Sequence, residues 1–262
     1  MKLLDGRDIA QYIKERHRAQ VSVMDPRPRM AIIRSEHNVA GDKYLKMKRA
    51  YGKDIGVDVD FYVEKPATMV ERIHKLNRDK NVTGILIQLP LEDASQTAAA
   101  LAAVAPEKDV DGLGPDTKFE PGTVKASLWL LAAYNVPVQG KVVIVGQGRL
   151  VGKPLADRLE ASGVDVHRID IRTKDLKAAL QDADMIFTGT GKPGLIKSDM
   201  VKDGAVVVDT GSPRGELEPS LYERKDLTIT PNPGGVGPMT VASLFDNLLI
   251  AQEAANRKQN RG

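Results

Sequence analysis

Continuous apolar runs alternate along the chain with segments whose apolar positions recur every three to four residues. The continuous runs are typical of strands covered on both faces, and the recurring spacing is typical of helices packed on such a sheet. The alternation predicts an α/β fold with a mostly parallel sheet. Strands are predicted at Met30–Ile33, Val57–Val63, Gly84–Leu89, Lys141–Val145, Val164–Ile169, Met185–Thr188, Ala205–Asp209 and Leu227–Thr230. Helices are predicted at Ile9–Gln20, Gly41–Ile55, Thr68–Arg78, Leu150–Ala161 and Asp175–Leu180.

A stretch crowded with proline and glycine separates the two halves of this pattern, between Ala105 and Thr123. We interpret it as the crossing between two domains, residues 1–120 and residues 121–240. A long amphipathic helix is predicted at Val241–Asn256, and residues 241–262 are expected to return to the first domain and complete it. The polar tail Arg257–Gly262 is expected to fray.

Composition excludes several classes of function. The 262 residues include no cysteine, which removes disulfides, thiolate nucleophiles and cysteine-ligated metals. The four histidines are scattered without ligand spacing, so no metal site is expected. A net charge of +3 and 4% aromatic residues give no support for nucleic-acid binding. No apolar run is long enough to span a membrane, and the chain turns polar directly after its first residue, so a soluble cytoplasmic protein is expected.

A glycine turn follows the apolar strand that ends at Val145. Gly146, Gly148 and Gly152 stand between this strand and helical sequence, an arrangement in which the backbone can approach a pyrophosphate at a helix N-terminus. Asp170 follows the next strand, where an acidic side chain can accept hydrogen bonds from an adenosine ribose. The turn therefore predicts dinucleotide binding; a tight turn without a ligand is the structural alternative.

Three polar features stand out in the first half. Tyr44 and Lys48 are four residues apart, so a helix places them on one face, although a solvated basic helix would show the same spacing. Gln88 ends an apolar strand, where a buried amide needs partners; a capped strand end is the alternative. Asp109 and Asp111 lie in a loop that a plain Asx turn would also explain.

The segment Pro231–Thr240 holds three glycines and three prolines in ten residues. That is more conformational restriction than a simple connection needs, which favours a loop shaped against a ligand.

These segments, in this order, resemble the bifunctional methylenetetrahydrofolate dehydrogenase/methenyltetrahydrofolate cyclohydrolase family over nearly the whole chain. The pieces that carry the resemblance are Tyr44 with Lys48, Gln88–Leu91, Lys108–Gly112, Val151–Pro154 and Pro233–Thr240. The family's fold consists of two α/β domains around a cleft: an N-terminal catalytic domain and a Rossmann-like dinucleotide-binding domain. The resemblance also implies a homodimer.

The resemblance implies a role for each matching residue. Lys48 would be the catalytic lysine, Tyr44 would lie against the folate, and Gln88 would help to set the state of the lysine. Asp111 would bind the pterin, and the region of Gly234 and Gly235 would border folate and nicotinamide.

The chain departs from the family pattern mainly on the cofactor side. The turn Gly146-Gln147-Gly148 replaces Gly-Arg-Ser, and Asp170-Ile171 replaces His-Ser. A Gly-Asp-Val stretch expected after Asp209 is not evident between Ser212 and Arg224.

These replacements bear on the choice between NAD and NADP. A carboxylate accepts hydrogen bonds from a free ribose hydroxyl and repels a 2′-phosphate, so Gln147 and Asp170 favour NAD slightly. Arg149 and Arg172 could instead bind that phosphate. The predicted cofactor-binding residues are Gly146, Gln147, Gly148, Arg149, Gly152, Asp170 and Arg172.

The predicted function is oxidation of 5,10-methylenetetrahydrofolate with NAD or NADP, followed by hydrolysis of the methenyl product to 10-formyltetrahydrofolate. Two alternatives stay open: an enzyme of the same fold with only one of these activities, and a dinucleotide-sensing protein without catalysis. A shikimate-dehydrogenase-like enzyme would not explain Tyr44, Lys48, Gln88 and Asp111 together.

Overall fold

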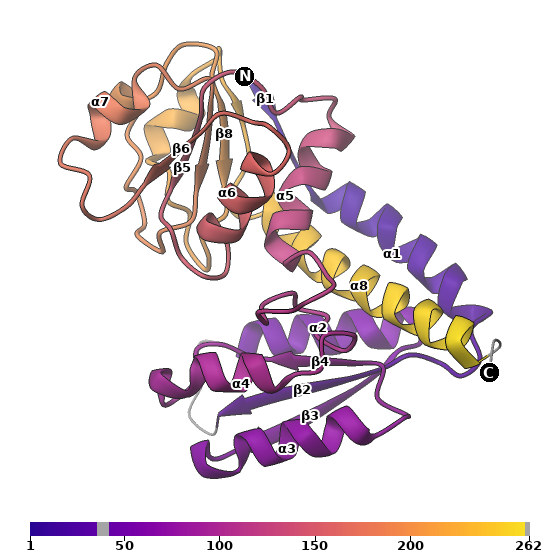
Figure 1. Cartoon of the computed structure of the whole chain (residues 1–262). Coiled ribbons are helices and arrows are strands. Elements are labelled where there is room, and N and C mark those ends of the chain that lie inside the picture. The colour runs from indigo at the N-terminus through magenta and orange to yellow at the C-terminus, as the bar shows by residue number, and fades with distance from the viewer. Residues whose placement is uncertain (36–41, 260–262) are drawn as a thin grey trace. The chain divides into compact units, whose positions relative to one another are not determined.

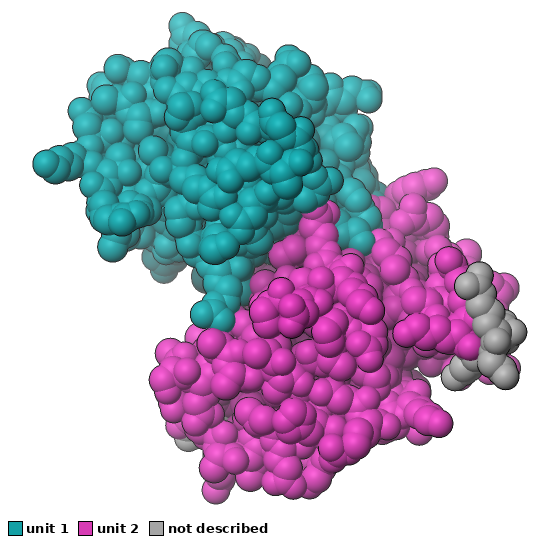
Figure 2. Space-filling model, viewed as in Figure 1, with its two compact units in different colours: residues 1–10, 123–240 teal, residues 11–122, 241–262 magenta. Residues whose placement is uncertain are grey.

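The computed structural model describes residues 1–35 and 42–259 (Figure 1). The chain forms two compact units, which Figure 2 shows in different colours. Unit 1 contains residues 1–10 and 123–240, and unit 2 contains residues 11–122 and 241–262. Helices α1 (Arg7–Ser22) and α8 (Val236–Gln259) contribute residues to both units.

Unit 1 is built on a six-stranded parallel sheet in the order β1-β9-β8-β7-β5-β6. Its strands are β1 (Lys2–Leu3), β5 (Val142–Val145), β6 (Val166–Ile169), β7 (Met185–Thr188), β8 (Val206–Asp209) and β9 (Thr228–Ile229). Its helical segments are α5 (Gly122–Ala133), α6 (Gly152–Glu160), α7 (Leu176–Leu180), η3 (Ser198–Met200) and η4 (Pro219–Glu223). β5 and β7 are buried along their whole length, which explains their continuous apolar sequences.

Unit 2 holds a three-stranded parallel sheet in the order β3-β2-β4. Its remaining elements are β2 (Arg29–Ser35), α2 (Asp42–Ile55), β3 (Asp58–Glu64), α3 (Pro66–Arg78), β4 (Gly84–Ile87), η2 (Ala94–Gln96) and α4 (Thr97–Ala103). Residues Ala31 and Ile33 of β2 pack with α3 and α4 in one core. On β4, Gly84 faces α8, because a side-chain carbon added there would lie 2.7 Å from Leu248.

The α/β class and the parallel sheets are confirmed, and every predicted strand is present. Gly41, the predicted start of one helix, lies outside the described residues. The predictions missed α4 and α5. Helix α4 has only seven residues and is mostly alanine, whereas α5 is apolar on all sides and therefore carries no amphipathic signal.

The last helix is longer than predicted at both ends. It begins at Val236 rather than Val241, because Pro238 falls in its first turn, where a missing N–H costs nothing. It continues to Gln259, so Arg257 and Lys258 are helical, in contrast to the expected fraying.

The first ten residues pack with unit 1, whereas the predicted first domain begins at residue 1. Strand β1 pairs with β9 in parallel, and the backbone N–H groups of Lys2 and Leu4 each donate a hydrogen bond of 2.8 Å to the carbonyls of Leu227 and Ile229. Because β9 belongs to unit 1, this edge strand carries the first ten residues into the same unit.

Within unit 2, α8 holds the loop that carries Asp111. The buried amide Nδ2 of Asn247 donates hydrogen bonds of 2.9 Å to the carbonyls of Val110 and Glu120. Ser243 Oγ, one turn earlier, donates to the carbonyl of Gly122 at 2.6 Å. The return of the C-terminal helix therefore fixes both ends of this loop.

We expect Asn247→Ala to destabilise the protein by about 1–3 kcal/mol, because one buried and one part-buried carbonyl lose their donor. For a chain of this size that corresponds to a fall in Tm of roughly 2–10 °C, measured by calorimetry. The matched control is Asn81→Ala at an exposed position, which should leave Tm unchanged. An equal Tm for the two variants would contradict the anchoring role of Asn247.

Candidate active site

Lys48 lies on α2 and reaches the carboxyl end of β4. Its Nζ donates a 2.8 Å hydrogen bond to Oε1 of Gln88, the residue that follows β4. The backbone N–H of Gln88 donates to the carbonyl of Ile33 at 2.8 Å and extends the β2–β4 ladder by one residue. Nε2 of Gln88 donates to the carbonyl of Leu89 at 3.1 Å. The amide is thus held at both ends, and its oxygen faces the lysine.

Asp111 completes an electrostatic pair with Lys48. Burial lowers the pKa of the Lys48 amine, and the negative charge of Asp111 opposes that shift. Burial raises the pKa of Asp111 to about 6; the charge of Lys48 opposes this shift, and nearby Asp109 adds to it. The amine therefore gives up its proton more readily than an exposed lysine does.

Neighbouring residues of the same motif support the loop. Nζ of Lys108 donates to the carbonyls of Leu76 and Asp79, at 3.1 Å and 2.6 Å, and so satisfies the C-terminal end of α3. Oδ2 of the buried Asp109 accepts a 2.8 Å hydrogen bond from the N–H of Gly114. Lys108 and Asp109 thus shape the loop, and Asp111 interacts with the lysine.

Tyr44 precedes Lys48 by one turn of α2, and its side chain is half-buried. The structure therefore brings Lys48, Gln88 and Asp111 together in unit 2, with Tyr44 on the same helix face as Lys48. The solvated-helix reading of Tyr44 and Lys48 does not fit a lysine whose amine is desolvated.

The glycine turn lies at the carboxyl end of β5 in unit 1. Gly146 has a φ of +92°, and a side-chain carbon on it would lie 2.8 Å from the carbonyl oxygen of Gly189. A side-chain carbon on Gly152 would lie 1.7 Å from the carbonyl oxygen of Gly146, so only glycine fits at the start of α6. Gly148 is exposed, and a side-chain carbon on it would lie 3.9 Å from the carbonyl oxygen of Gly189, at ordinary contact distance. These glycines leave the bare backbone cradle that a pyrophosphate needs.

The cradle sits where the order of the sheet reverses. β5 has β6 on one side and β7 on the other, and ligands of doubly wound sheets bind in the crevice outside such a reversal. Among the cofactor candidates, Gly146, Gln147, Gly148, Arg149 and Gly152 surround the turn after β5, and Asp170 and Arg172 follow β6.

Asp170 and Arg172 bind each other. Nε and Nη2 of Arg172 lie 2.9 Å and 2.6 Å from Oδ2 of Asp170, and the backbone N–H of Arg172 donates to Oδ1 at 2.9 Å. These hydrogen bonds keep the pKa of Asp170 below its usual value. The carboxylate is therefore ionised at neutral pH, and its own neighbour partly neutralises it.

Gln147 presents an acceptor at the turn. Its Nε2 donates to the carbonyl of Ile144 at 3.1 Å, which fixes the orientation of the amide. Its Oε1 is buried and has no hydrogen-bond partner among the described residues. Arg149 is exposed.

Comparison with known proteins agrees with both halves of this geometry. Residues 4–111 match the model of the tetrahydrofolate dehydrogenase/cyclohydrolase catalytic domain, and residues 121–256 match that of the NAD(P)-binding domain. The "Bifunctional protein FolD" of Wolinella succinogenes is 38% identical over 96% of this chain and 96% of its own length. This chain belongs to the tetrahydrofolate dehydrogenase/cyclohydrolase family.

Solved structures of family members have the same fold. The bifunctional methylenetetrahydrofolate dehydrogenase/cyclohydrolase of Campylobacter jejuni matches with a TM-score of 0.91 and 33% identity, over 97% of this chain and 99% of that one. The Trypanosoma brucei dehydrogenase-cyclohydrolase, complexed with NADP and an inhibitor, matches with a TM-score of 0.90 and 27% identity, over 97% and 98% of the two chains.

Gly234 and Gly235, which family resemblance assigns to the substrate site, belong to unit 1. Gly234 has a φ of +118°, and its carbonyl accepts a 2.8 Å hydrogen bond from the N–H of Gly6. A side-chain carbon on Gly235 would lie 2.8 Å from the carbonyl oxygen of Pro231. The loop is thus held in a conformation that requires glycine, as its composition predicts.

Glu216 is a buried carboxylate that sequence reasoning missed. It hydrogen-bonds the loop that follows β7. Gly215-Glu216-Leu217 differs from the family's expected Gly-Asp-Val only by conservative replacements. That similarity could have identified Glu216 from the sequence, provided that glutamate was accepted in the place of aspartate.

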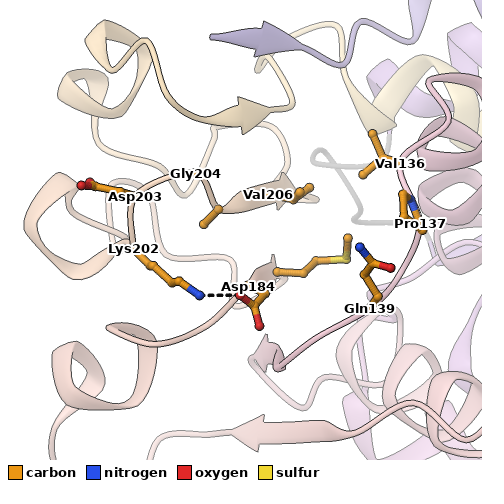
Figure 3. A pocket seen from close by; sticks show the side chains of 10 residues that line it. Val136, Pro137, Gln139, Asp184, Lys202, Asp203, Gly204 and Val206 are labelled. Atoms are coloured by element: carbon orange, nitrogen blue, oxygen red, sulfur yellow. Dashed lines mark hydrogen bonds and ion pairs between the residues drawn. The ribbon is translucent and has the colours of Figure 1, made fainter.

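Unit 1 contains a cavity of about 250 Å³. Figure 3 shows the side chains that line it, among them Lys202, which forms an ion pair with Asp184. Met185 and Val206 line it from the first residues of β7 and β8. It therefore opens at the amino ends of the strands, whereas the glycine turn lies at their carboxyl ends.

Two further findings concern only the described residues. No group of three histidine, aspartate or glutamate side chains lies close enough to hold a metal ion. No helix is both long enough and apolar enough to cross a membrane.

We expect Asp111→Asn to lower the pKa of Lys48 further, because the charge of Asp111 is what opposes the effect of burial. A pH titration of lysine Cε signals by NMR measures this pKa. Asp116→Asn, which removes an exposed carboxylate from the following loop, is the matched control. An unchanged or higher Lys48 pKa in Asp111→Asn would contradict the pairing.

Proposed function

We propose that this protein oxidises 5,10-methylenetetrahydrofolate to 5,10-methenyltetrahydrofolate with NAD or NADP and hydrolyses the product to 10-formyltetrahydrofolate. The observation that carries this proposal is the desolvated amine of Lys48, held by Gln88 and paired with Asp111. The same chain contains the glycine cradle of a dinucleotide-binding unit. Family membership supports the combination.

The roles of the two units follow from this function. We propose that residues 1–120 and 241–262 form the folate-binding catalytic domain, apart from the first ten residues, and that residues 121–240 bind the dinucleotide. Asp111 binds the pterin, Tyr44 lies against the folate, and Gly234 and Gly235 border the substrate.

The oxidation step depends mainly on how the folate and the nicotinamide are positioned relative to each other. The nicotinamide, when bound, supplies the hydride acceptor, and the protein must hold the folate methylene carbon against it. Gly146 and Gly152 fit the cofactor, because a side chain on either would collide with neighbouring backbone and disrupt the tight turn that forms the cradle. No acid or base is needed in this step, since the methylene carbon loses only a hydride.

Hydrolysis requires a base that accepts a proton from water. Water adds to the methenyl carbon, and one of its protons passes to the neutral amine of Lys48. As the bond between that carbon and N5 breaks, the new hydroxyl loses its proton and becomes the formyl oxygen, N5 takes up a proton in its place, and the formyl group stays on N10. Because desolvation lowers the pKa of Lys48, its amine is neutral more often than that of an exposed lysine and can accept the first proton. Gln88 fixes the position of Nζ throughout.

The alternatives are less well supported. An enzyme with only the dehydrogenase activity would not need the desolvated amine of Lys48. A dinucleotide sensor would need neither Lys48 nor Asp111. The family match covers both the catalytic and the NAD(P)-binding domain.

We propose that the cofactor is used as NAD at least as well as NADP. The argument rests on Asp170, which is ionised beside the place where a 2′-phosphate would bind, and on Gln147, a neutral residue in place of the family's arginine. A free ribose hydroxyl can donate to the carboxylate of Asp170, whereas a phosphate is repelled by it. Arg172 works in the opposite direction, although Asp170 already engages it.

We also propose a homodimer in the cytoplasm. β3 lies at the edge of its sheet, and its exposed N–H and C=O groups form a template for pairing with another chain. The absence of cysteine agrees with a reducing compartment. Sedimentation equilibrium should give twice the chain mass of 28.5 kDa; a single-chain mass at micromolar concentration would contradict the dimer.

We expect Lys48→Met to abolish hydrolysis of methenyltetrahydrofolate, because it removes the amine and keeps the length of the side chain. The absorbance of the methenyl compound follows both reactions in one assay, first formation and then decay. Folate binding and Tm should survive the change. The matched control is Lys46→Met, an exposed residue two positions earlier on the same helix.

Two results would overturn these assignments. Hydrolysis by Lys48→Met at a rate near that of the unaltered protein would remove Lys48 from the mechanism. Failure of the folded, unaltered protein to form methenyltetrahydrofolate with either cofactor would remove the dehydrogenase activity.

We expect Asp170→Asn to shift the ratio of kcat/KM for NADP over NAD upward by about tenfold, because the repulsion between its carboxylate and a 2′-phosphate is removed. Arg172→Ala should shift the ratio in the opposite direction, because it removes the only cation bound to Asp170 among the described residues. Parallel steady-state kinetics with both cofactors measure the ratio. A tenfold preference for NADP in the unaltered protein would show that the arginines dominate.

A further inference from the structure

The carboxylate of Glu216 is completely buried at the carboxyl end of β7. Oε1 accepts hydrogen bonds from the backbone N–H groups of Thr190 and Gly191, at 2.7 Å and 2.6 Å. Oε2 accepts from the hydroxyls of Thr188 and Thr190, the latter at 2.7 Å. No lysine or arginine of the described chain forms an ion pair with it. Four donors of the β7 loop thus replace a counter-ion.

Such a site resembles one built for an anion. Successive backbone N–H groups ending in a left-handed residue form a concavity that binds negative charge, and Gly191 has a φ of +74°. A buried carboxylate costs several kcal/mol unless its hydrogen bonds are satisfied. Because the loop supplies all four donors, its conformation and the position of the carboxylate depend on each other.

A second carboxylate fixes Glu216 from the other side. Oδ2 of Asp209, the last residue of β8, accepts a 2.9 Å hydrogen bond from the backbone N–H of Glu216, and Oδ1 accepts from Gly211 at 2.7 Å. The backbone N–H of Asp209 donates to Oγ1 of Thr230, next to β9, at 2.7 Å. Glu216 therefore ties the β7 loop to the ends of β8 and β9.

The β7 loop in turn touches the glycine turn. The carbonyl oxygen of Gly189 is the atom that limits Gly146, and a side-chain carbon on Gly189 would lie 3.2 Å from Cβ of Val151. β5 and β7 are the two strands that flank the reversal in strand order. One wall of the cofactor crevice is thus the loop that Glu216 holds.

We propose that Glu216 is a positioning residue for the nicotinamide cofactor, acting through the loop Thr188–Gly191. The inference rests on the proposed function and assigns Glu216 to the dehydrogenase reaction alone. The proposed role of Glu216 does not involve Lys48, Gln88 or Asp111, which all belong to unit 2. Loss of its charge should therefore weaken cofactor binding and leave the hydrolysis of methenyltetrahydrofolate intact.

Glu216→Gln tests this, because the amide keeps the size of the side chain but offers an NH₂ group to donors that need an acceptor. On the full-length protein, calorimetric titration with NAD and NADP should show Kd raised about tenfold or more. The KM for the cofactor should rise with it, while the KM for methylenetetrahydrofolate should stay constant. Amide NMR signals of Thr190 and Gly191 should shift without any ligand.

Two further variants serve as controls for Glu216→Gln. Glu216→Asp keeps the carboxylate and should bind the cofactor better than Glu216→Gln. Glu218→Gln makes the same chemical change two residues later, where the side chain is half-buried and accepts a hydrogen bond from Ser220; it should behave as the unaltered protein does. Cyclohydrolase activity, measured in each variant, reports whether the chain is folded.

A cofactor Kd within about twofold of the unaltered value in folded Glu216→Gln would overturn the proposal. If that variant also loses cyclohydrolase activity, Thr190→Val decides, since it removes one donor and keeps the side-chain shape. An unchanged Kd there would likewise overturn it, and a Kd raised about threefold or more would support it. Lack of cofactor binding by the unaltered protein would instead refute the proposed dehydrogenase function.

Discussion

The catalytic unit depends on one amine that is kept out of water. Burial favours the neutral form of Lys48, and the charge of Asp111 favours the protonated form. The pKa of the amine therefore reflects the balance of these two opposing effects. Gln88 contributes differently, because its oxygen accepts a hydrogen bond from either form of the amine. The neutral amide of Gln88 thus fixes the position of the Lys48 amine, and the carboxylate of Asp111 balances its charge. A carboxylate in the place of Gln88 would favour the protonated lysine and so remove the proposed base.

Much of this site could be predicted because its residues lie on regular elements or beside them. The four-residue spacing of Tyr44 and Lys48 needs only a helix, and Gln88 needs only the end of a buried strand. The supporting contacts were beyond prediction, since they join distant segments: Asn247 of the last helix holds the loop of Asp111. Glu216 sits in a loop without periodicity, so only the similarity of Gly215-Glu216-Leu217 to the family's Gly-Asp-Val pointed to it, and its burial depends on packing that no local pattern encodes.

The carboxylates of unit 1 are stabilised in two different ways. Near the surface, Asp170 pairs with the exposed Arg172, an interaction that water and salt weaken. Inside, Glu216 and Asp209 are satisfied by hydroxyl and backbone donors without a cation. Burial raises the pKa of Asp209 to about 6, and the charge of Glu216 adds to the rise. The interior carboxylates fix loop geometry, whereas the surface pair is free to exchange partners with a ligand.

The two proposed reactions place unequal demands on these arrangements. Hydrolysis needs a group whose proton affinity is tuned, so it depends on the electrostatics around Lys48. Hydride transfer needs position, so it depends on the glycine cradle and on the loops that support it. Gln147 and Asp170, where the chain departs from its family, belong to the unit that lacks Lys48. Changes there can alter the choice of cofactor without disturbing the base, which explains how the cofactor side can diverge while the folate side keeps the family's residues.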